Sequence, residues 1–414
     1  MPAAGSRKDL TALYSDGPVY AVIGKNYGDE GKGLAADYFV SRRTVSPSEA
    51  LVIRHNGGAQ AGHTVDLKDG GRFVFHQLSS GSFRGARTLW ADTFMPDLYK
   101  LGDEISDFKA LCELPKIFAS LNSCPVLVYD VLLNQAIEDA RADKRHGSCG
   151  MGINEAKLRI RAGFGISMEE FLGSSAKSIL IKLAEIRKDY VGKRLAELED
   201  EAQLPQEYIR LLNDKNLLIN YIDECLYNAE KIIGADDKGI RGLIGNSSGI
   251  IFEGAQGLLL DEDYEQGAPH LTASKTGLHN PLRFSERFGL KLTEVCYVSR
   301  SYVTRHGNGP LPMEFTADAA SRFTDRTNIT NKWQGTLRYA SHESASFVPP
   351  VEKDTSVLPE EASVSLMLTH LNETDGKLLT EDAASDVESV PGLKKTFTKI
   401  YRSYSLFAED VQVV

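Results

Sequence analysis

Residues 19–33 read VYAVIGKNYGDEGKG, and this stretch decides the fold. An apolar run ends in a glycine-rich turn that carries Lys32, and the helix-compatible residues 34–39 follow it. This order predicts a strand, a phosphate-binding loop and a helix. Backbone N–H groups of such a loop, together with the helix N-terminus behind it, attract phosphate. The stretch therefore predicts a nucleotide site in an α/β fold.

The loop departs from the ordinary P-loop in its spacing and its charge. Six residues separate Gly24 from Gly31, and a glycine follows the lysine where the ordinary motif has Ser or Thr. Asp29 and Glu30 also place two carboxylates in a loop that should attract anions. We therefore expect at least one of them to serve as a metal ligand or a base. The alternative is a glycine-rich turn with solvated charges.

Length, composition and charge limit the class of protein. The 414 residues are 42% hydrophobic and 25% charged, which suits one large α/β domain or two ordinary ones. The formal charge of −10 argues against a nucleic-acid or membrane-surface partner. Five cysteines without a CxxC pair favour reduced thiols. Residues 1–15 lack a signal-peptide core, so we expect a cytoplasmic protein.

Two further strand candidates run into stretches of small residues. Residues 51–54 lead into GGAQAGHT at 57–64, where small residues allow close approach to a ligand and deliver His63. An imidazole there can donate to a developing negative charge, although a lone histidine is more often structural. Residues 250–252 lead into EGAQG at 253–257, which places the Gln256 amide at a strand end between small residues, where it can hydrogen-bond a ligand.

Residues 28–33, 56–65 and 252–257 together closely resemble the motifs of the adenylosuccinate synthetase family. The resemblance runs from about Val19 to about Gly376. It implies a ligase that joins L-aspartate to C6 of a purine nucleotide, normally IMP, with GTP and Mg²⁺. It also implies a homodimer with a largely parallel central sheet and a single domain over residues 16–414. Helical patterns predict a helical subregion at about 155–235 within that domain.

The family resemblance assigns catalytic roles around the first loop. It implies that Asp29 removes the purine N1 proton, so that O6 attacks the γ-phosphate. Lys32 and His63 would then stabilise the transferred charge, and Gln256 would stabilise the 6-phosphoryl intermediate. The Asp29 carboxylate and the Gly62 carbonyl would hold magnesium. A carboxylate inside an anion-binding loop is then explained by its two roles.

The resemblance also implies which residues bind the two nucleotides. The triphosphate would contact Gly28, Glu30, Gly31, Lys32, Gly33, Thr64, Thr369, His370 and Asn372. The purine substrate would contact Asn26, Asp29, Gln60, Ser148, Cys149, Arg159, Gln256, Thr276 and Gly307. Gln60 replaces the usual Asn, and Cys149 replaces the second hydroxyl of the family's phosphate loop. Phosphate binding in that loop would therefore depend on Ser148 and on backbone donors.

The segment that grips aspartate in most members departs furthest from the family pattern. Residues 325–339 read DRTNITNKWQGTLRY, which is similar to the archaeal-type branch. That branch also includes the phage 2-aminoadenylosuccinate synthetases acting on dGMP. A dicarboxylate substrate needs cationic and hydroxyl donors, so we expect Arg338, Thr327 and Thr330 to bind aspartate.

The residues that would read the donor base are also changed. Residues 369–372 read THLN, whereas the family normally has Thr-Lys-Leu-Asp, whose carboxylate reads guanine. The amide of Asn372 offers a donor and an acceptor, which suits adenine. His370 stands where the family has a lysine, so the alkyl chain that would cover the base is absent. We therefore expect ATP or dATP to be used at least as well as GTP.

Three alternatives remain open at this point. A synthetase of the same chemistry could act on GMP or dGMP, although retention of Asp29 favours IMP. A nucleotide-binding module that has lost catalysis would show no turnover with any purine. A structural α/β protein is disfavoured because the three motifs occur together.

The sequence also makes two predictions about local structure. Pro125–Tyr129 is a strand candidate, and residues 167–170 form a helix capping box.

Overall fold

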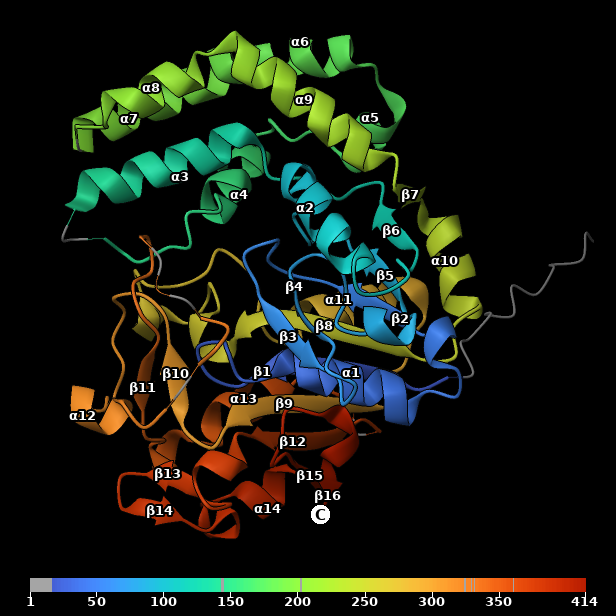
Figure 1. Cartoon of the computed structure of the whole chain (residues 1–414), viewed down its shortest axis with the longest axis vertical. Coiled ribbons are helices and arrows are strands. Elements are labelled where there is room, and N and C mark those ends of the chain that lie inside the picture. Colours follow the sequence, from blue (N-terminus) through green and yellow to red (C-terminus); the bar gives the residue numbers. More distant parts are fainter. Residues whose placement is uncertain are drawn as a thin grey trace, which may run out of the picture.

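The computed structural model describes residues 17–142, 145–201, 203–323, 325–328, 330, 332–359 and 361–414. A ten-stranded sheet forms its centre (Figure 1). In spatial order its strands are β16 (Gln412–Val413), β15 (Lys399–Arg402), β12 (Ser363–Thr369), β9 (Glu294–Arg300), β1 (Val19–Gly24), β8 (Ile250–Gly257), β2 (Leu51–Arg54), β5 (Arg87–Trp90), β6 (Ile117–Ser120) and β7 (Ile232–Ala235). Neighbouring strands are parallel except β15 and β16. The predicted largely parallel sheet is confirmed.

Strand β1 lies near the middle of the sheet and is buried along its whole length. Successive side chains of a strand point to opposite faces, so an apolar run suits a strand that is covered on both sides. Tyr20 and Val22 pack with helix α1 (Lys32–Arg43) on one face. Ala21 and Ile23 pack into the opposite layer. The position of β1 fixes where the phosphate-binding loop begins.

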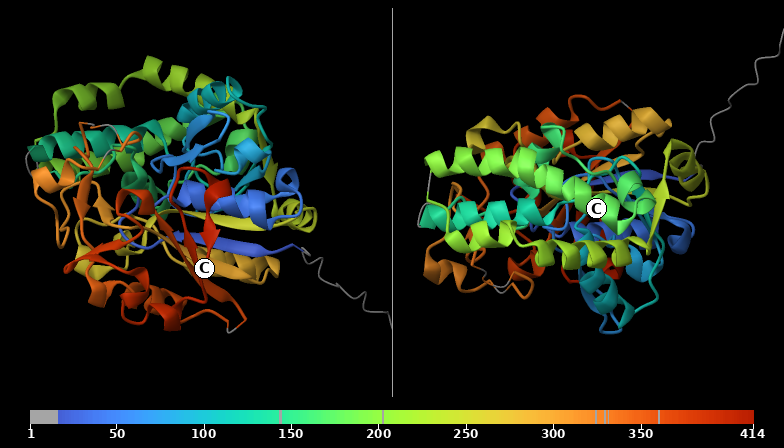
Figure 2. Two further views of the ribbon diagram at one scale, coloured as in Figure 1. Left: turned by 60° about the horizontal axis from the view of Figure 1, so that its bottom comes forward. Right: turned by 90° about the horizontal axis from the view of Figure 1, so that it is seen from above.

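Helices cover both faces of the sheet and form a further layer beyond it (Figures 1 and 2). The face opposite α1 carries α10 (Asp237–Gly245), α11 (His279–Phe288), α13 (Pro349–Thr355) and α14 (Leu393–Thr396). The further layer contains α3 (Val128–Arg141), α4 (Ile153–Arg161), α5 (Met168–Gly173), α6 (Ala176–Ile186), the π-helix η4 (Arg187–Val191), α7 (Gly192–Glu201), α8 (Gln206–Leu212) and α9 (Lys215–Ala229). This layer stands over one end of the sheet in Figure 1.

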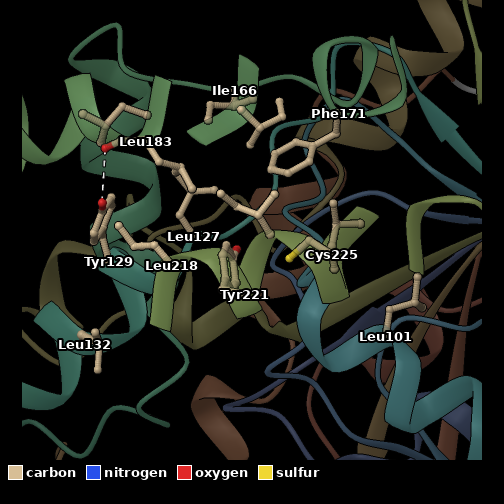
Figure 3. Close-up of a cluster of buried hydrophobic side chains, with 14 of the residues drawn as sticks. Leu101, Leu127, Tyr129, Leu132, Ile166, Phe171, Leu183, Leu218, Tyr221 and Cys225 are labelled. Atoms are coloured by element: carbon tan, nitrogen blue, oxygen red, sulfur yellow. Dashed lines mark hydrogen bonds between the residues drawn. The ribbon is translucent and has the colours of Figure 1, made fainter. Parts of the chain in front are cut away.

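The helical layer has its own apolar core. Side chains from α3, α6 and α9 meet there, together with α2 (Leu98–Lys109) from the sheet side (Figure 3). Tyr129 is buried in this core, and its hydroxyl donates to the carbonyl of Leu183 at 3.2 Å. The layer is therefore packed firmly against the sheet region and can contribute side chains to a shared cavity. In the described parts of the chain, no helix is long and apolar enough to cross a membrane.

Among the described residues, three two-stranded sheets and the short helix α12 (Ala317–Ala320) lie outside these layers. The sheets pair β3 (His63–Asp66) with β4 (Arg72–Phe75), β10 (Val303–Arg305) with β11 (Arg338–Ala340), and β13 (Leu378–Thr380) with β14 (Ala383–Ser385).

Two local predictions can be compared directly with these elements. The capping box is confirmed, because the Ser167 side chain accepts from the Glu170 N–H at 3.3 Å and the Glu170 carboxylate accepts from the Ser167 N–H at 2.9 Å. The strand predicted at Pro125–Tyr129 is wrong, because α3 begins at Val128. Val126 and Leu127 are buried as the entry to that helix rather than as a strand.

Candidate active site

A cavity of about 900 Å³ lies at the carboxyl ends of the central strands. Its lining comes from the loop after β1, the segment after β2, and the ends of β8, β9 and β12. Helices α3, α4 and α7 line its other side. The carboxyl edge of a parallel sheet is where ligands bind in α/β folds. The cavity is therefore the candidate active site.

The phosphate-binding loop is shaped by left-handed backbone positions and by an internal carboxylate. Gly28 has φ 95° and Asp29 has φ 59°, a region that most side chains avoid. Glu30 Oε1 accepts from the N–H groups of Asn26 at 3.0 Å and Gly28 at 2.8 Å. Glu30 Oε2 lies 2.5 Å from Lys32 Nζ. Glu30 lines the cavity, but its carboxylate is engaged in holding the loop together.

Asp29 is the carboxylate that the loop leaves available for chemistry. Its side chain is 22% exposed, and Oδ2 lies 3.5 Å from Nε2 of His306. The Nε–H of Arg300 donates to the Asp29 carbonyl at 2.5 Å and so holds its backbone. A carboxylate in this position can accept a proton or bind a cation.

His63 begins β3 and forms a buried pair with Glu253 of β8. Its Nδ1 lies 2.6 Å from Glu253 Oε1. Burial lowers the pKa of His63 to about 4, against the opposing effect of Glu253. Burial alone would raise the pKa of the Glu253 carboxyl, but Arg54, His63 and Ser80 together lower it to about 2. The pair therefore consists of a neutral imidazole that donates from Nδ1 to a carboxylate.

This arrangement leaves Nε2 of His63 buried without a hydrogen-bond partner among the described residues. His63 lines the cavity, so the unpartnered nitrogen can be satisfied by a ligand. A phosphate group beside it would raise the pKa of His63, because an opposite charge favours the protonated form. His63 can then donate from Nε2 to a phosphoryl oxygen while Glu253 holds Nδ1.

Two glutamines add unsatisfied polar groups to the lining. Both amide atoms of Gln60 are buried and have no partner in the described parts of the chain. A buried unpaired polar group costs about 1–3 kcal/mol, which a polar ligand would offset. Gln256 is the penultimate residue of β8, has φ 64° and also lines the cavity. These two amides suit the oxygens and nitrogens of a purine.

The loop that follows α3 forms another wall of the cavity. Ser148 Oγ accepts from Asn134 Nδ2 at 3.0 Å, and burial raises the pKa of Cys149 to about 11, so this thiol stays protonated. Glu138 accepts from the backbone of this loop and from Arg141, both at 3.0 Å. Arg141 is a cavity-lining cation that sequence analysis missed, since it lies in a helix without a motif.

The end of β12 forms the opposite wall. Thr369 Oγ1 donates to a carbonyl of the phosphate-binding loop at 2.7 Å. Glu373 accepts from His370 Nδ1 at 2.8 Å and from the Tyr302 hydroxyl at 2.6 Å, and burial lowers the pKa of His370. Asn372 is exposed on the lining. No sequence pattern indicated Glu373, because it lies one residue beyond the THLN stretch at 369–372.

The cavity brings together most of the predicted site residues. Those that line it are Gly28, Asp29, Glu30, Gly31, Lys32, Gly33, Gln60, Gly62, His63, Thr64, Ser148, Cys149, Gln256, Thr327, Thr369, His370 and Asn372. Predicted residues outside the lining are Asn26, Arg159, Thr276, Gly307, Thr330 and Arg338. Thr330 is exposed, whereas the side chains of Asn26 and Thr276 are buried and bonded to Ser299 and Asp261.

Two arginines predicted to bind substrate are engaged elsewhere. Arg159 is fully buried and bonds Asp130 at 2.8 and 2.9 Å, which ties α4 to the start of α3. Arg338 bonds Glu314 and donates to the carbonyls of Gly307 at 2.8 Å and Gly309 at 2.7 Å. The geometry therefore supports neither the predicted substrate contact of Arg159 nor the aspartate contact of Arg338.

Magnesium fits the oxygen donors that the cavity offers. Asp29 contributes a carboxylate and Gly62 a carbonyl, and both residues line the cavity. The described residues contain no group of three His, Cys, Asp or Glu side chains placed to hold a metal. Mg²⁺ is commonly held by one or two carboxylates and by substrate phosphates rather than by an all-protein cage. The donor set therefore matches a metal that arrives with a nucleotide.

The fold and the cavity define an α/β protein with a modified phosphate-binding loop at the carboxyl edge of a parallel sheet. The family described as adenylosuccinate synthetase matches residues 21–338, which is more than half of the chain. The chain belongs to the adenylosuccinate synthetase family.

Individual relatives agree with this assignment. The adenylosuccinate synthetase of Thermoplasma acidophilum is 31% identical over 310 residues, covering 74% of this chain and 66% of its own. That of Chromohalobacter salexigens is 31% identical over 296 residues, covering 71% and 64%. The chain thus spans about two thirds of the length of these relatives.

Solved structures share the fold. A fully ligated adenylosuccinate synthetase from Plasmodium falciparum has a TM-score of 0.65 at 20% identity and covers 96% of this chain and 87% of its own. The cyanophage S-2L succinoaminodeoxyadenylate synthetase, bound to dGMP and to dATP as an energy donor, has a TM-score of 0.59 at 15% identity, with coverages of 96% and 95%.

Proposed function

We propose that this chain is a ligase that joins L-aspartate to C6 of a purine nucleoside monophosphate, with IMP as the acceptor and adenylosuccinate as the product. Hydrolysis of a nucleoside triphosphate would drive the reaction through a 6-phosphoryl intermediate. One observation carries the proposal: four groups suited to this chemistry, Asp29, Lys32, His63 and Gln256, come from three distant segments and line one cavity.

In the first step, Asp29 takes the proton from purine N1, and the electron pair makes O6 a nucleophile. O6 then attacks the γ-phosphorus, and the bond between that phosphorus and the β–γ bridging oxygen breaks. Lys32 and His63 face the phosphoryl oxygens, where fixed positive charge and hydrogen-bond donors stabilise the transition state. Magnesium held by Asp29 and Gly62 would add positive charge at the same oxygens.

In the second step, the amine of aspartate attacks C6, and O6 leaves with the phosphoryl group as inorganic phosphate. Gln256 would hold the purine oxygens through its amide. We place the carboxylates of aspartate beside Arg326 and Thr327 rather than Arg338. Arg326 is exposed on the cavity lining, and Thr327 Oγ1 lies 3.0 Å from Thr64 Oγ1 and 2.8 Å from Arg72 Nη2. A guanidinium with neighbouring hydroxyls suits a dicarboxylate.

The partners follow from the same proposal. They are a purine nucleoside monophosphate, ATP or GTP, L-aspartate and a second copy of the chain in a cytoplasmic homodimer. Retention of Asp29 favours IMP, because the phage enzymes that act on dGMP, which the sequence resembles, often replace this residue. Assignment to the archaeal-type branch stays a prediction, as does the choice between IMP and dGMP.

One panel of assays tests the function. Aspartate and Mg²⁺ are supplied with IMP, GMP or dGMP and with GTP or ATP, and products are identified by mass. We expect adenylosuccinate from IMP. Product from GMP or dGMP alone would identify a 2-amino acceptor within the same chemistry. Absence of turnover with every purine would instead support a nucleotide-binding module that has lost catalysis.

The Asp29→Asn variant tests the proposed base. Loss of a general base reduces turnover by roughly 100- to 10,000-fold, and we expect a loss in that range while the thermal unfolding midpoint stays unchanged. The measurement is kcat with the best acceptor from the panel. Near-normal turnover in a folded Asp29→Asn variant would contradict the mechanism.

A further inference from the structure

His306 stands beside the proposed base, and neither a sequence motif nor the family resemblance gave it a role. It follows directly after β10 and lines the same cavity as Asp29. Its Nε2 lies 3.5 Å from Asp29 Oδ2 and 3.0 Å from Asn328 Oδ1. One imidazole nitrogen therefore faces two side-chain oxygens, one of which belongs to the proposed base.

The surrounding hydrogen bonds determine which atom carries the proton. Asn328 Nδ2 donates to Asp325 Oδ2 at 3.0 Å, which turns its Oδ1 toward His306. Asp325 is ionised and therefore accepts this hydrogen bond. Burial would raise the pKa of its carboxyl, but Arg300, whose Nη2 lies 2.8 Å away, lowers it. Both neighbours of His306 Nε2 are thus acceptors, so Nε2 carries the hydrogen and donates it.

The other ring nitrogen of His306, Nδ1, does not help to hold the orientation of the imidazole ring. Nδ1 of His306 is buried without a partner among the described residues. A histidine with a purely structural role normally has both nitrogens paired, since buried polar groups are rarely left unsatisfied. The orientation of the ring is therefore set by its contacts at Nε2, with Asn328 and Asp29.

Asp29 needs such a contact. Its backbone is fixed by the left-handed conformation at φ 59° and by Arg300, but these contacts leave the carboxylate free to rotate about the side-chain bonds. Proton transfer requires an oxygen within about 2.6–3.2 Å of the proton donor. A displacement of about 1 Å costs roughly 100-fold in rate. An N–H group that holds one carboxylate oxygen would leave the other directed at the substrate.

We propose that His306 is a positioning residue that orients the Asp29 carboxylate for removal of the purine N1 proton. The inference rests on the proposed function and assigns a residue within that site. His306 would act through its Nε2–H, which donates to Asn328 at 3.0 Å and lies 3.5 Å from Asp29 Oδ2, a contact that would shorten to a hydrogen bond when substrate is bound. It does not accept the substrate proton, which is transferred to Asp29. The role predicts a loss in the step that forms the 6-phosphoryl group, with little effect on substrate affinity.

The test isolates that step. In the absence of aspartate, a triphosphate labelled with ¹⁸O at the β–γ bridge reports reversible transfer of its γ-phosphoryl group to O6 through scrambling of the label. We expect His306→Leu to reduce the scrambling rate and kcat by roughly 10- to 100-fold. The KM values of both nucleotides and of aspartate should stay within about twofold, since the positioning contact is lost but no binding contact is. His306→Gln should recover most of the rate, because its amide keeps an N–H donor.

A matched control makes the same substitution at a histidine outside the cavity. His279 is exposed at the start of α11 and lies outside the cavity, so His279→Leu should leave scrambling and kcat unchanged. Unchanged scrambling in His306→Leu would overturn the inference, as would equal losses in the Leu and Gln variants with unchanged unfolding midpoints. Absence of scrambling and product in the wild-type protein with every purine would overturn the proposed function first, and the inference with it.

Discussion

At the scale of single residues, the buried pair of His63 and Glu253 links the sheet to the proposed phosphoryl transfer. Glu253 lies on β8 and accepts from the Ser80 N–H at 3.1 Å as well as from His63. Its carboxylate holds the imidazole in one tautomer and would stabilise the imidazolium once a phosphate is bound. A carboxylate that orients a catalytic histidine in this way is worth several orders of magnitude in serine hydrolases.

The Glu253→Gln variant tests this role. A neutral amide of the same shape keeps the packing but removes the charge that supports protonated His63. We expect kcat to fall by roughly 10- to 1,000-fold with a smaller change in the KM of the triphosphate. Steady-state kinetics measure both values. Ser80→Ala, which leaves the carboxylate in place, should show a smaller loss, and wild-type kcat in a folded Glu253→Gln protein would contradict the role.

At the scale of structural elements, the segment that contains Arg326 and Thr327 reaches the cavity, whereas β11 does not. Arg338 of β11 is engaged by Glu314 and by two carbonyls, which leaves few of its donors for a substrate. Arg326 is exposed on the lining. We therefore expect the residue that binds the carboxylates of aspartate to lie on the segment that contains Arg326 and Thr327.

Parallel Arg→Lys substitutions distinguish the two arginines. An ammonium cannot reproduce a bidentate guanidinium contact, so Arg326→Lys should raise the KM of aspartate by roughly tenfold or more while the nucleotide KM values stay nearly constant. Arg338→Lys is the matched control and should leave the KM of aspartate unchanged. The opposite pattern would restore the assignment made from sequence alone.

The end of β12 carries the prediction about the donor base. Asn372 is exposed on the lining, while the nearby Glu373 carboxylate already accepts from His370 and Tyr302. Selection of the base is therefore expected to depend on the Asn372 amide. A carboxylate at this position would accept both the N1–H and the exocyclic amine of guanine, whereas an amide suits adenine.

We expect the wild-type protein to use ATP at least as well as GTP. Asn372→Asp should shift the ratio of kcat/KM for ATP and GTP toward GTP by roughly tenfold or more, since unpaired polar groups penalise the wrong base. Asn216→Asp makes the same chemical change on the exposed surface of α9 and should leave the ratio unchanged. A strong wild-type preference for GTP that Asn372→Asp does not alter would contradict the prediction.

The sequence predicted the elements around the site better than the partners of individual side chains. Strands β1, β2 and β8 were recognisable, because apolar runs that end in glycine or polar residues indicate strands buried on both faces. The short apolar run at Pro125–Tyr129 misled, since such a run fits a buried helix start equally well. The partners of Arg338 and Arg159 could not be predicted, because Glu314 and Asp130 lie 24 and 29 residues away from them in sequence.

At the scale of the whole molecule, folding buries several histidines in their neutral form. Burial lowers the pKa values of His55 and His342 to about 3 and that of His63 to about 4, from an ordinary value near 6.5. Above pH 6.5 these histidines are neutral in both the folded and the unfolded chain. As the pH falls from about 6.5 to about 4, the unfolded chain binds protons that the folded chain does not, so stability is lost over that range.

Each such histidine contributes about 1.4 kcal/mol per pH unit, so the three together add about 4 kcal/mol per pH unit to the slope of stability below pH 6. Urea unfolding at pH 8, 7, 6 and 5.5 measures it. His55→Phe should reduce the slope by about 1.4 kcal/mol per pH unit, because the unfolded chain takes up one proton fewer and neither His55 nitrogen has a partner among the described residues. The exposed residue His279 provides the control, since His279→Phe should leave the slope unchanged. A slope in His55→Phe equal to that of the wild type would contradict the assignment of a neutral buried imidazole.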